Sequence, residues 1–274
     1  MVNLYSFVIQ THSRTKKVIE LLKNINELSK HGIKFKIIIS DNGNRKKNDF
    51  ESSGISFEYL DNRDCTNASL HVFRIFSLPL SKVFYIHDDD RFNIDNLLLA
   101  INYIELHDPN ILVSPKLSIE KDIIFKDLEE VFKMYFLNAK NNCPLFSGFY
   151  IKNMNIMSEK LILDGIYNGK YGDVYIMSRL LTLVEKSLLF KHAFLNYTEH
   201  DGNDNKIRNL NDREELSNYI KSCGGFTNYI ISNVIFNGYT SKLLKFLFGL
   251  LLTLFKPKIF IQLYKKLIFK IKLQ

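Results

Sequence analysis

The chain has little of what marks a disulfide-bonded or membrane-spanning protein. Its 274 residues include 3 Cys, 5 Pro, 12 Gly and no Trp. The cysteines, Cys65, Cys143 and Cys223, are odd in number and form no CxxC pair, which excludes a disulfide framework and favours a reducing compartment. The first ten residues carry no basic residue and only a short apolar run, so we expect a strand there and no signal peptide.

What is abundant indicates a folded domain. Hydrophobic residues make up 46% and charged residues 24% of the chain, with 22 Phe among them. A disordered chain has fewer large apolar residues, and collagen-like or coiled-coil chains have a different composition. The length suffices for an α/β core.

The net positive charge of the chain comes from its last 33 residues. Residues 242–274 hold eight Lys and no acidic residue, so the 37 basic and 29 acidic residues of the whole chain leave 29 of each in residues 1–241. The lysines alternate with Leu, Ile and Phe, and after Pro257 the apolar residues recur at helical spacing. We therefore expect an in-plane amphipathic helix on an anionic membrane surface, and no nucleic-acid partner. The alternative is a helix packed on the rest of the chain or on a second subunit.

No segment of this tail is expected to cross a bilayer. Phe246–Phe255 has ten uncharged residues, and a spanning helix needs roughly 18–20.

Strand and helix patterns alternate along most of the chain. Strands are predicted at 4–9, 34–40, 55–60, 82–87, 111–114 and 145–151, and helices at 18–31, 68–78, 94–106, 123–140, 174–184 and 213–240. This order predicts an α/β fold with a mixed, mostly parallel sheet flanked by helices and followed by a C-terminal helical extension. We expect a nucleotide-sugar-binding domain over 1–205 (on the resemblance given below), a helical return over 206–241 and the basic tail over 242–274.

Two polar clusters fall where predicted strands end. They are 41–44, Asp-Asn-Gly-Asn, and 88–90, three consecutive Asp. In open α/β sheets ligands bind at the carboxyl ends of the strands. Adjacent carboxylates raise one another's pKa, and a divalent cation such as Mg²⁺ or Mn²⁺ removes that conflict. Because Mg²⁺ is bound through a few carboxylates and substrate phosphates, a nucleoside diphosphate is a natural partner. The alternative is that Asp90 or Asn93 caps the following helix.

Five segments in register resemble family 2 glycosyltransferases of the GT-A fold, in particular bacterial O-antigen or capsule transferases. They are 6–14 (S-F-V-I-Q-T-H-S-R), 38–44 (I-I-S-D-N-G-N), 84–92 with its D-D-D run, 144–150 (P-L-F-S-G-F-Y) and 171–173 (Y-G-D). They are similar to the family's opening strand and T-x-x-R turn, its D-[DN]-G-[SN] turn, its D-x-D segment, its P-x-x-S-G stretch and its late G-[ED]-D motif.

The resemblance implies transfer of a sugar, with inversion, from a nucleotide-diphosphate donor to a hydroxyl of a glycan acceptor. We expect this acceptor to be lipid-linked and to lie at the cytoplasmic face of the inner membrane. It places Asp41 and Asn42 at the base or ribose, with Thr11 and Arg14 shaping that pocket. Asp88 and Asp90 take the metal and diphosphate positions, Asp89 being a further candidate, and the family often has Asp where His87 stands. Ser147 and Gly148 would line the acceptor side, and Asp173 would be the catalytic base.

Several residues have two interpretations. Asp173 is either the base or the N-cap of the helix that starts at Val174. His200 is a metal or phosphate contact or a solvated side chain. Arg63 and Arg74 reach phosphate or pair with Asp61 and Asp64.

Two other functions compete with the transferase. A sugar-phosphate nucleotidyltransferase requires a glycine-rich phosphate loop after the first strand, and residues 10–14 contain no glycine. A catalytically inactive membrane scaffold in polysaccharide assembly is the other alternative, and it predicts no metal-dependent nucleotide-sugar binding.

Overall fold

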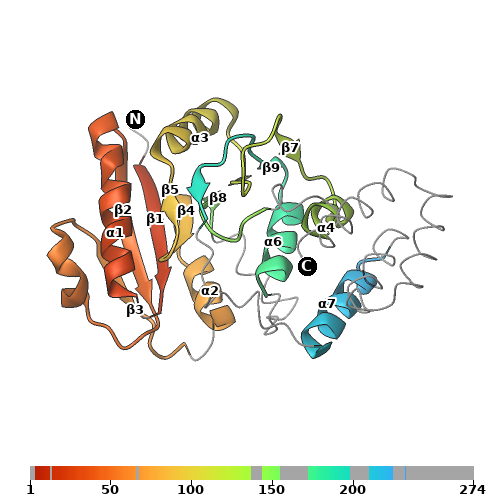
Figure 1. Cartoon of the computed structure of the whole chain (residues 1–274), viewed down its shortest axis with the longest axis horizontal. Helices are drawn as coiled ribbons and strands as arrows, with labels where there is room; N and C mark the ends of the chain where they lie inside the picture. Colours follow the sequence, from red (N-terminus) through yellow and green to blue (C-terminus); the bar gives the residue numbers. More distant parts are fainter. Residues whose placement is uncertain are drawn as a thin grey trace, which may run out of the picture.

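A computed structural model describes residues 4–12, 14–65, 68–136, 144–154, 172–197, 210–224 and 232. Figure 1 shows a central sheet with helices on both faces. The main sheet has the strand order β3-β2-β1-β4-β8-β6-β9-β7, and a second, two-stranded sheet pairs β10 with β5. The predicted α/β class is confirmed.

The first half supplies four parallel neighbours of the sheet. The elements are β1 (Leu4–Thr11), α1 (Thr15–Asn26), η1 (Glu27–His31), β2 (Lys34–Asp41), η2 (Lys47–Ser53), β3 (Glu58–Asp61), α2 (Ala68–Phe76) and β4 (Ser81–His87). β1 pairs in parallel with β2 and with β4, and β2 with β3. The predicted elements of this half are confirmed, with shifts of a few residues at their ends.

The second half makes the sheet mixed. It contains β5 (Arg91–Phe92), α3 (Ile94–His107), β6 (Ile111–Val113), β7 (Ile123–Ile124), α4 (Leu128–Phe136), β8 (Phe149–Asn153), α6 (Gly172–Leu183), β9 (Ser187–Leu189), β10 (Leu195–Asn196) and α7 (Leu210–Ser222). β8 runs antiparallel to both β4 and β6, whereas β6 and β9 are parallel.

Alternating side chains of β1 build two cores. Tyr5, Phe7 and Ile9 belong to a cluster with the apolar residues of α1 and α3, whereas Val8 belongs to one with α2, α4 and α6. This division follows from the two-residue period of a strand, and both faces of the sheet are therefore covered. The first of these helices, α1, buries Val18, Leu21, Leu22 and Ile25, the spacing that predicted it, and η1 ends at Gly32 in the left-handed conformation.

Two predicted elements need correction. Residues 123–140 do not form one helix, because Ile123–Ile124 is strand β7, which pairs with β9, and α4 begins only at Leu128. The strand predicted at 145–151 begins at Phe149. Strands β5, β9 and β10 were not predicted, because each has only two or three residues and exists through a distant partner.

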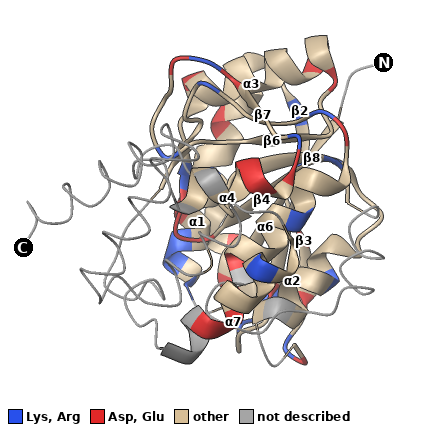
Figure 2. Cartoon of the chain, turned by 90° about the vertical axis from the view of Figure 1, so that its right-hand side faces the viewer, with Lys and Arg blue, Asp and Glu red and all other residues tan. Residues whose placement is uncertain are grey.

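The surface of the described elements carries both signs of charge. Figure 2 shows Lys/Arg and Asp/Glu segments interspersed on the face it displays, which agrees with the balanced charge of residues 1–241. Among the described residues, none of the helices combines the length and hydropathy that a bilayer crossing requires. The helix α7 falls within the predicted helical return, but it ends at Ser222, so the helix predicted over 213–240 is not continuous. The tail 242–274 lies outside the described residues.

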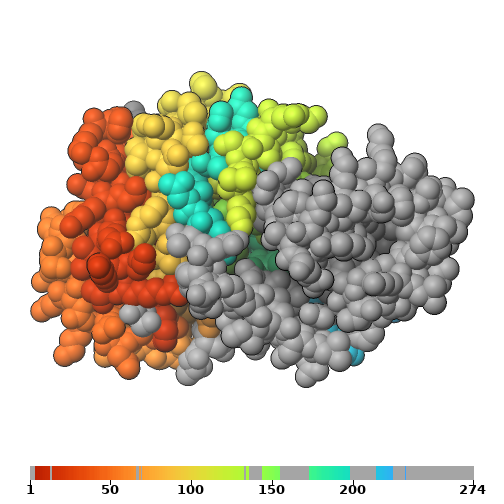
Figure 3. All heavy atoms as spheres, in the orientation of Figure 1, coloured from red at the N-terminus to blue at the C-terminus, as the bar shows by residue number. Residues whose placement is uncertain are grey.

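Segments far apart in sequence meet beside α3. Figure 3 shows the cyan segment near residue 190 at the surface, next to the yellow segment that includes α3. Here Leu195 pairs with Phe92, and Asn93 donates its backbone N–H to the Phe194 carbonyl at 3.1 Å. Residues 194–195 thus hold residues 92–93, which follow the acidic triplet.

Candidate active site

Three neighbouring parallel strands end together at the polar clusters. In the sheet register Thr11 lies opposite Asp41, and Gln10 lies opposite His87. Because the strands are parallel, their carboxyl ends lie at one edge, where Thr11, Arg14, Asp41, Asn42 and the triplet 88–90 are brought together. The sequence predicted this clustering.

Asp88 is held by β1 and the residues that follow it. Thr11 Oγ1 donates to Asp88 Oδ2 at 2.6 Å, and Arg14 Nη1 lies 3.3 Å from Asp88 Oδ1 and 2.5 Å from Asp89 Oδ2. Only 5% of Asp88 is exposed. Burial raises the pKa of this carboxyl, and the contacts with Thr11 and Arg14 oppose the rise. Arg14 therefore partly neutralises the triplet in the ligand-free protein.

The other two aspartates form a group with His87 that could hold a metal ion. One ligand atom from each of His87, Asp89 and Asp90 lies within 4.8 Å of the others. Asp90 is 1% exposed, and its backbone N–H donates to the His87 carbonyl at 3.3 Å. Two carboxylates and an imidazole suit Mn²⁺, so the residues present fit the divalent cation that the sequence predicts.

The hydrogen bonds around His87 prepare its ring as a ligand. Burial lowers the pKa of His87 to about 4, so the imidazole is neutral near pH 7. The Tyr85 hydroxyl donates its single proton to Gln10 Oε1 and lies 3.0 Å from His87 Nε2. Its oxygen can therefore accept from Nε2–H, which leaves the lone pair on Nδ1. Ser147 Oγ accepts the His87 backbone N–H at 3.1 Å and fixes the strand end.

This group differs in part from the predicted ligands. It contains Asp90 and Asp89, but Asp88 is outside it and bonded to Thr11 and Arg14. His87, which stands where the family often has Asp, belongs to it. His200 lies outside the described residues, and its role stays a prediction.

Asp41 is buried under the turn that follows β2. It is 0% exposed, and its Oδ1 accepts from the Gly43 backbone N–H at 2.7 Å while Oδ2 accepts from the Tyr59 hydroxyl at 3.1 Å. Burial raises the pKa of this carboxyl. A Cβ on Gly43 would lie 1.5 Å from the His12 carbonyl oxygen, so only glycine permits this close approach. Asp41 thus shapes the turn, and a contact with a base remains a prediction.

Asn42 is partly exposed at the same turn. Its backbone N–H donates to the Thr11 carbonyl at 3.2 Å, and its Nδ2 donates to the Cys65 carbonyl at 3.3 Å. The side-chain oxygen lies 3.1 Å from His12 Nδ1. These contacts join the ends of β1, β2 and β3.

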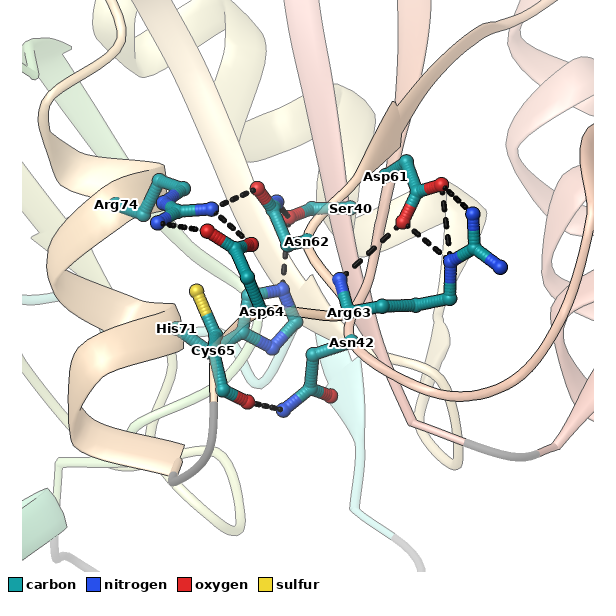
Figure 4. A network of polar contacts seen from close by, with 9 residues as sticks. All are labelled: Ser40, Asn42, Asp61, Asn62, Arg63, Asp64, Cys65, His71 and Arg74. Carbon is teal, nitrogen blue, oxygen red and sulfur yellow. Dashed lines mark hydrogen bonds and ion pairs between the residues drawn. The ribbon is translucent and has the colours of Figure 1, made fainter.

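A buried polar network that sequence reasoning missed lies beside this turn (Figure 4). His71 Nε2 lies 2.8 Å from Ser40 Oγ, which accepts from Asn62 Nδ2 at 2.7 Å. Asn62 Oδ1 in turn accepts from Arg74 at 3.3 Å. The available signal was a histidine within the apolar pattern of α2.

Three of the open interpretations are decided by the geometry. Arg63 and Arg74 pair with Asp61 and Asp64, as the second interpretation held; Figure 4 shows both ion pairs. Asn93 caps α3, since its side chain accepts from the Asn96 backbone N–H at 3.1 Å.

The N-cap interpretation of Asp173 is wrong. The helix α6 begins at Gly172, so Asp173 lies inside its first turn, where a carboxylate also interacts favourably with the helix dipole. Its role as base stays a prediction.

Ser147 and Gly148 immediately precede β8. Gly148 has φ +65°, and a Cβ there would lie 2.3 Å from the Leu195 side chain. The residue is therefore restricted to glycine by both backbone conformation and packing. Their predicted place on the acceptor side stays a prediction, because nothing in the ligand-free site identifies an acceptor.

The fold and this edge define a GT-A-type architecture, and comparison with solved structures shows the same. Fragment 1–349 of S. aureus TarS matches with a TM-score of 0.56 and 13% identity over 87% of this chain and 73% of that fragment. TarS itself matches with a TM-score of 0.55 and 13% identity over 89% of this chain, which spans 45% of TarS. The fragment in complex with UDP-GlcNAc matches with a TM-score of 0.50, 12% identity, and coverage of 86% and 71%.

At this low identity the likeness shows the fold alone. The chain has the GT-A glycosyltransferase fold that its motifs predict. No family model and no curated protein matches the sequence itself.

Proposed function

We propose that the protein is a metal-dependent, inverting glycosyltransferase that moves a sugar from a nucleotide-diphosphate donor to a hydroxyl of a glycan acceptor. The observation that carries the proposal is the meeting of His87, Asp89 and Asp90 with Arg14 at the carboxyl ends of β1 and β4. The GT-A fold supports it, as does the S. aureus TarS fragment, which was solved with UDP-GlcNAc and, separately, with UDP.

The chain's own residues divide the chemistry between them. His87, Asp89 and Asp90 would hold Mn²⁺ or Mg²⁺, which when bound supplies Lewis-acid stabilisation of the departing diphosphate. The Arg14 side chain is 41% exposed, so its guanidinium can reach a phosphate while it keeps its ion pair with Asp89. Asp88, bonded to Thr11, positions the loop that carries the ligands. Asp173 would accept the proton of the attacking hydroxyl.

We further propose that the acceptor is a lipid-linked glycan of bacterial surface polysaccharide synthesis. The support is the basic, acid-free sequence of residues 242–274, which suits an anionic lipid surface. The protein would then bind as a peripheral protein to the cytoplasmic face of the inner membrane. Deletion of 242–274 is expected to abolish sedimentation with vesicles of anionic phospholipid while donor binding is retained. Sedimentation of the truncated protein with those vesicles would contradict this part.

Calorimetric titration of nucleotides tests the catalytic proposal. UDP, GDP, CDP and dTDP are titrated with and without Mn²⁺ into the whole chain, and one of them is expected to bind only with the metal. Asp90→Asn should abolish that dependence, and Asp95→Asn, an exposed aspartate of α3, is the matched control. If the folded protein binds none of the four, the inactive-scaffold alternative is favoured instead.

Asp173→Asn tests the base separately. It should abolish sugar transfer and leave the affinity for the nucleotide unchanged, because the side chain acts on the acceptor. A fully active variant would remove Asp173 from this role.

A further inference from the structure

A buried histidine next to the proposed donor site has one ring nitrogen engaged and one without a hydrogen-bond partner. His71 is 0% exposed and lies in α2. Its Nε2 lies 2.8 Å from Ser40 Oγ, whereas its Nδ1 is buried and has no hydrogen-bond partner in the structure. An unsatisfied buried polar atom is uncommon in folded proteins and calls for a physical explanation.

The contacts of Ser40 indicate which nitrogen of His71 carries the proton. Ser40 Oγ accepts from Asn62 Nδ2 at 2.7 Å, so its own proton is available to His71 Nε2. With the proton on Nδ1, the Ser40 hydroxyl and Nε2 are both satisfied. With the proton on Nε2, both the hydroxyl proton and the Nδ1 lone pair lack a partner. The contacts therefore favour the Nδ1–H tautomer.

The His71 ring is also neutral near pH 7. Burial is the main cause that lowers the pKa of His71 to about 4, and the neighbouring His12, Arg74 and His87 contribute to the same shift. The neutral ring carries one proton, and this proton is on Nδ1, so Nδ1 is a buried N–H donor.

The position of this donor links it to the ends of three strands. Ser40 is the residue before Asp41 at the end of β2, and His12 and His87 lie at the ends of β1 and β4. Figure 4 shows the second ring nitrogen on the side of the network where Asn42 and Cys65 lie. The Asn42 side chain is held there only by bonds of 3.3 Å and 3.1 Å, so a ligand can displace it.

We propose that His71 Nδ1–H donates a hydrogen bond to an oxygen of the nucleoside diphosphate when the donor binds. The inference rests on the proposed function, since it names a residue of the same site. Ser40 and Asn62 hold the ring so that Nδ1 is aimed before the ligand arrives, while Arg74, paired with Asp64, holds Asn62.

Two substitutions separate the two nitrogens. His71→Gln places its side-chain amide near the position of Nε2, where the amide oxygen can accept from the Ser40 hydroxyl, but it removes the Nδ1 donor. His71→Asn places its amide nitrogen near Nδ1, so it keeps the donor and loses the contact with Ser40. His31→Gln, at an exposed histidine of η1, is the control.

The measurement is calorimetric titration of these variants with the nucleotide that binds the wild-type protein, in the presence of Mn²⁺. His71→Gln should bind about tenfold more weakly, the value of one hydrogen bond to a charged or polar oxygen. His71→Asn should bind within about threefold of the wild type, and thermal melting without ligand should show that both variants are folded. Titration with the free nucleoside tells whether the acceptor is on the base and ribose or on the phosphates.

The outcomes distinguish the two proposals. If the wild type binds the nucleotide and His71→Gln binds it with equal affinity, the inference is overturned and the proposed function stands. A larger loss in His71→Asn than in His71→Gln also overturns it, because the ring would then act only through Ser40. Absence of nucleotide binding in the wild type contradicts the proposed function itself.

Discussion

The buried His71 makes the stability of the protein depend on pH in a measurable way. Burial is the main cause that lowers the pKa of His71 from 6.5 to about 4, and the neighbouring His12, Arg74 and His87 contribute in the same direction. In the unfolded chain the ring takes up a proton below about pH 6.5, whereas in the folded protein it does not until about pH 4. The unfolded state therefore binds more protons between these values, and the free energy of unfolding falls as the pH falls.

The size of the effect follows from the same values. The difference between 6.5 and about 4, at about 1.4 kcal/mol for each pH unit, gives at most about 3 kcal/mol. Between about pH 7 and about pH 5 most of this, about 2 kcal/mol, should be lost. Above about pH 6.5 the contribution is constant.

Urea unfolding followed by circular dichroism at several pH values measures this loss. The quantity of interest is the difference in the free energy of unfolding between the wild type and His71→Gln, because every other titrating group, His87 included, cancels in it. That difference should fall by about 2 kcal/mol between about pH 7 and about pH 5. His31→Gln should give a curve parallel to the wild type. Parallel curves for the wild type and His71→Gln would refute the reasoning that His71 is buried and neutral.

Three further predictions concern packing and the turn after β2. Phe84→Ala should lower the free energy of unfolding by about 3–5 kcal/mol in urea titrations, because this fully buried ring stacks on Phe7 with centroids 5.1 Å apart. Gly43→Ala should lower the melting temperature and weaken nucleotide binding, since the new Cβ would meet the His12 carbonyl. Gly54→Ala should also lower the melting temperature, because Gly54 has φ +69°, but it should retain the affinity for the nucleotide. Tyr59→Phe should destabilise the protein by about 1–3 kcal/mol at neutral pH in the same titrations, because Asp41 loses a donor; an unchanged value would mean that water replaces the hydroxyl.

The local pattern of the chain was enough to place most of the elements. Strands β1, β2 and β4 each contain a short apolar run, and the spacing of Val18, Leu21 and Ile25 describes the buried face of α1. These signals are local, since a helix or a buried strand shows its period within its own residues. The same signals failed at 123–140, where Ile123–Ile124 is a strand only because β9 lies beside it.

The candidate site, too, could be predicted from the sequence only in part. The polar clusters after β2 and β4 could be recognised because acidic residues directly follow apolar runs. The distribution of roles within the triplet could not, because Asp88 is taken by Thr11 and Arg14 while His87 joins Asp89 and Asp90. That choice depends on which side chain each residue meets across the sheet.

The alternation of strands and helices, the GT-A resemblance and the edge at which chemistry is expected can be read from the order of the residues alone. The strand order, the covering of the two faces of the sheet and the burial of Asp41 and His71 follow from the way the elements pack. Periodicity and turn chemistry are properties of neighbouring residues, whereas burial and hydrogen-bond partners arise from contacts between residues far apart in the chain. The Ser40–His71 pair, 31 residues apart, exists because β2 and α2 pack together.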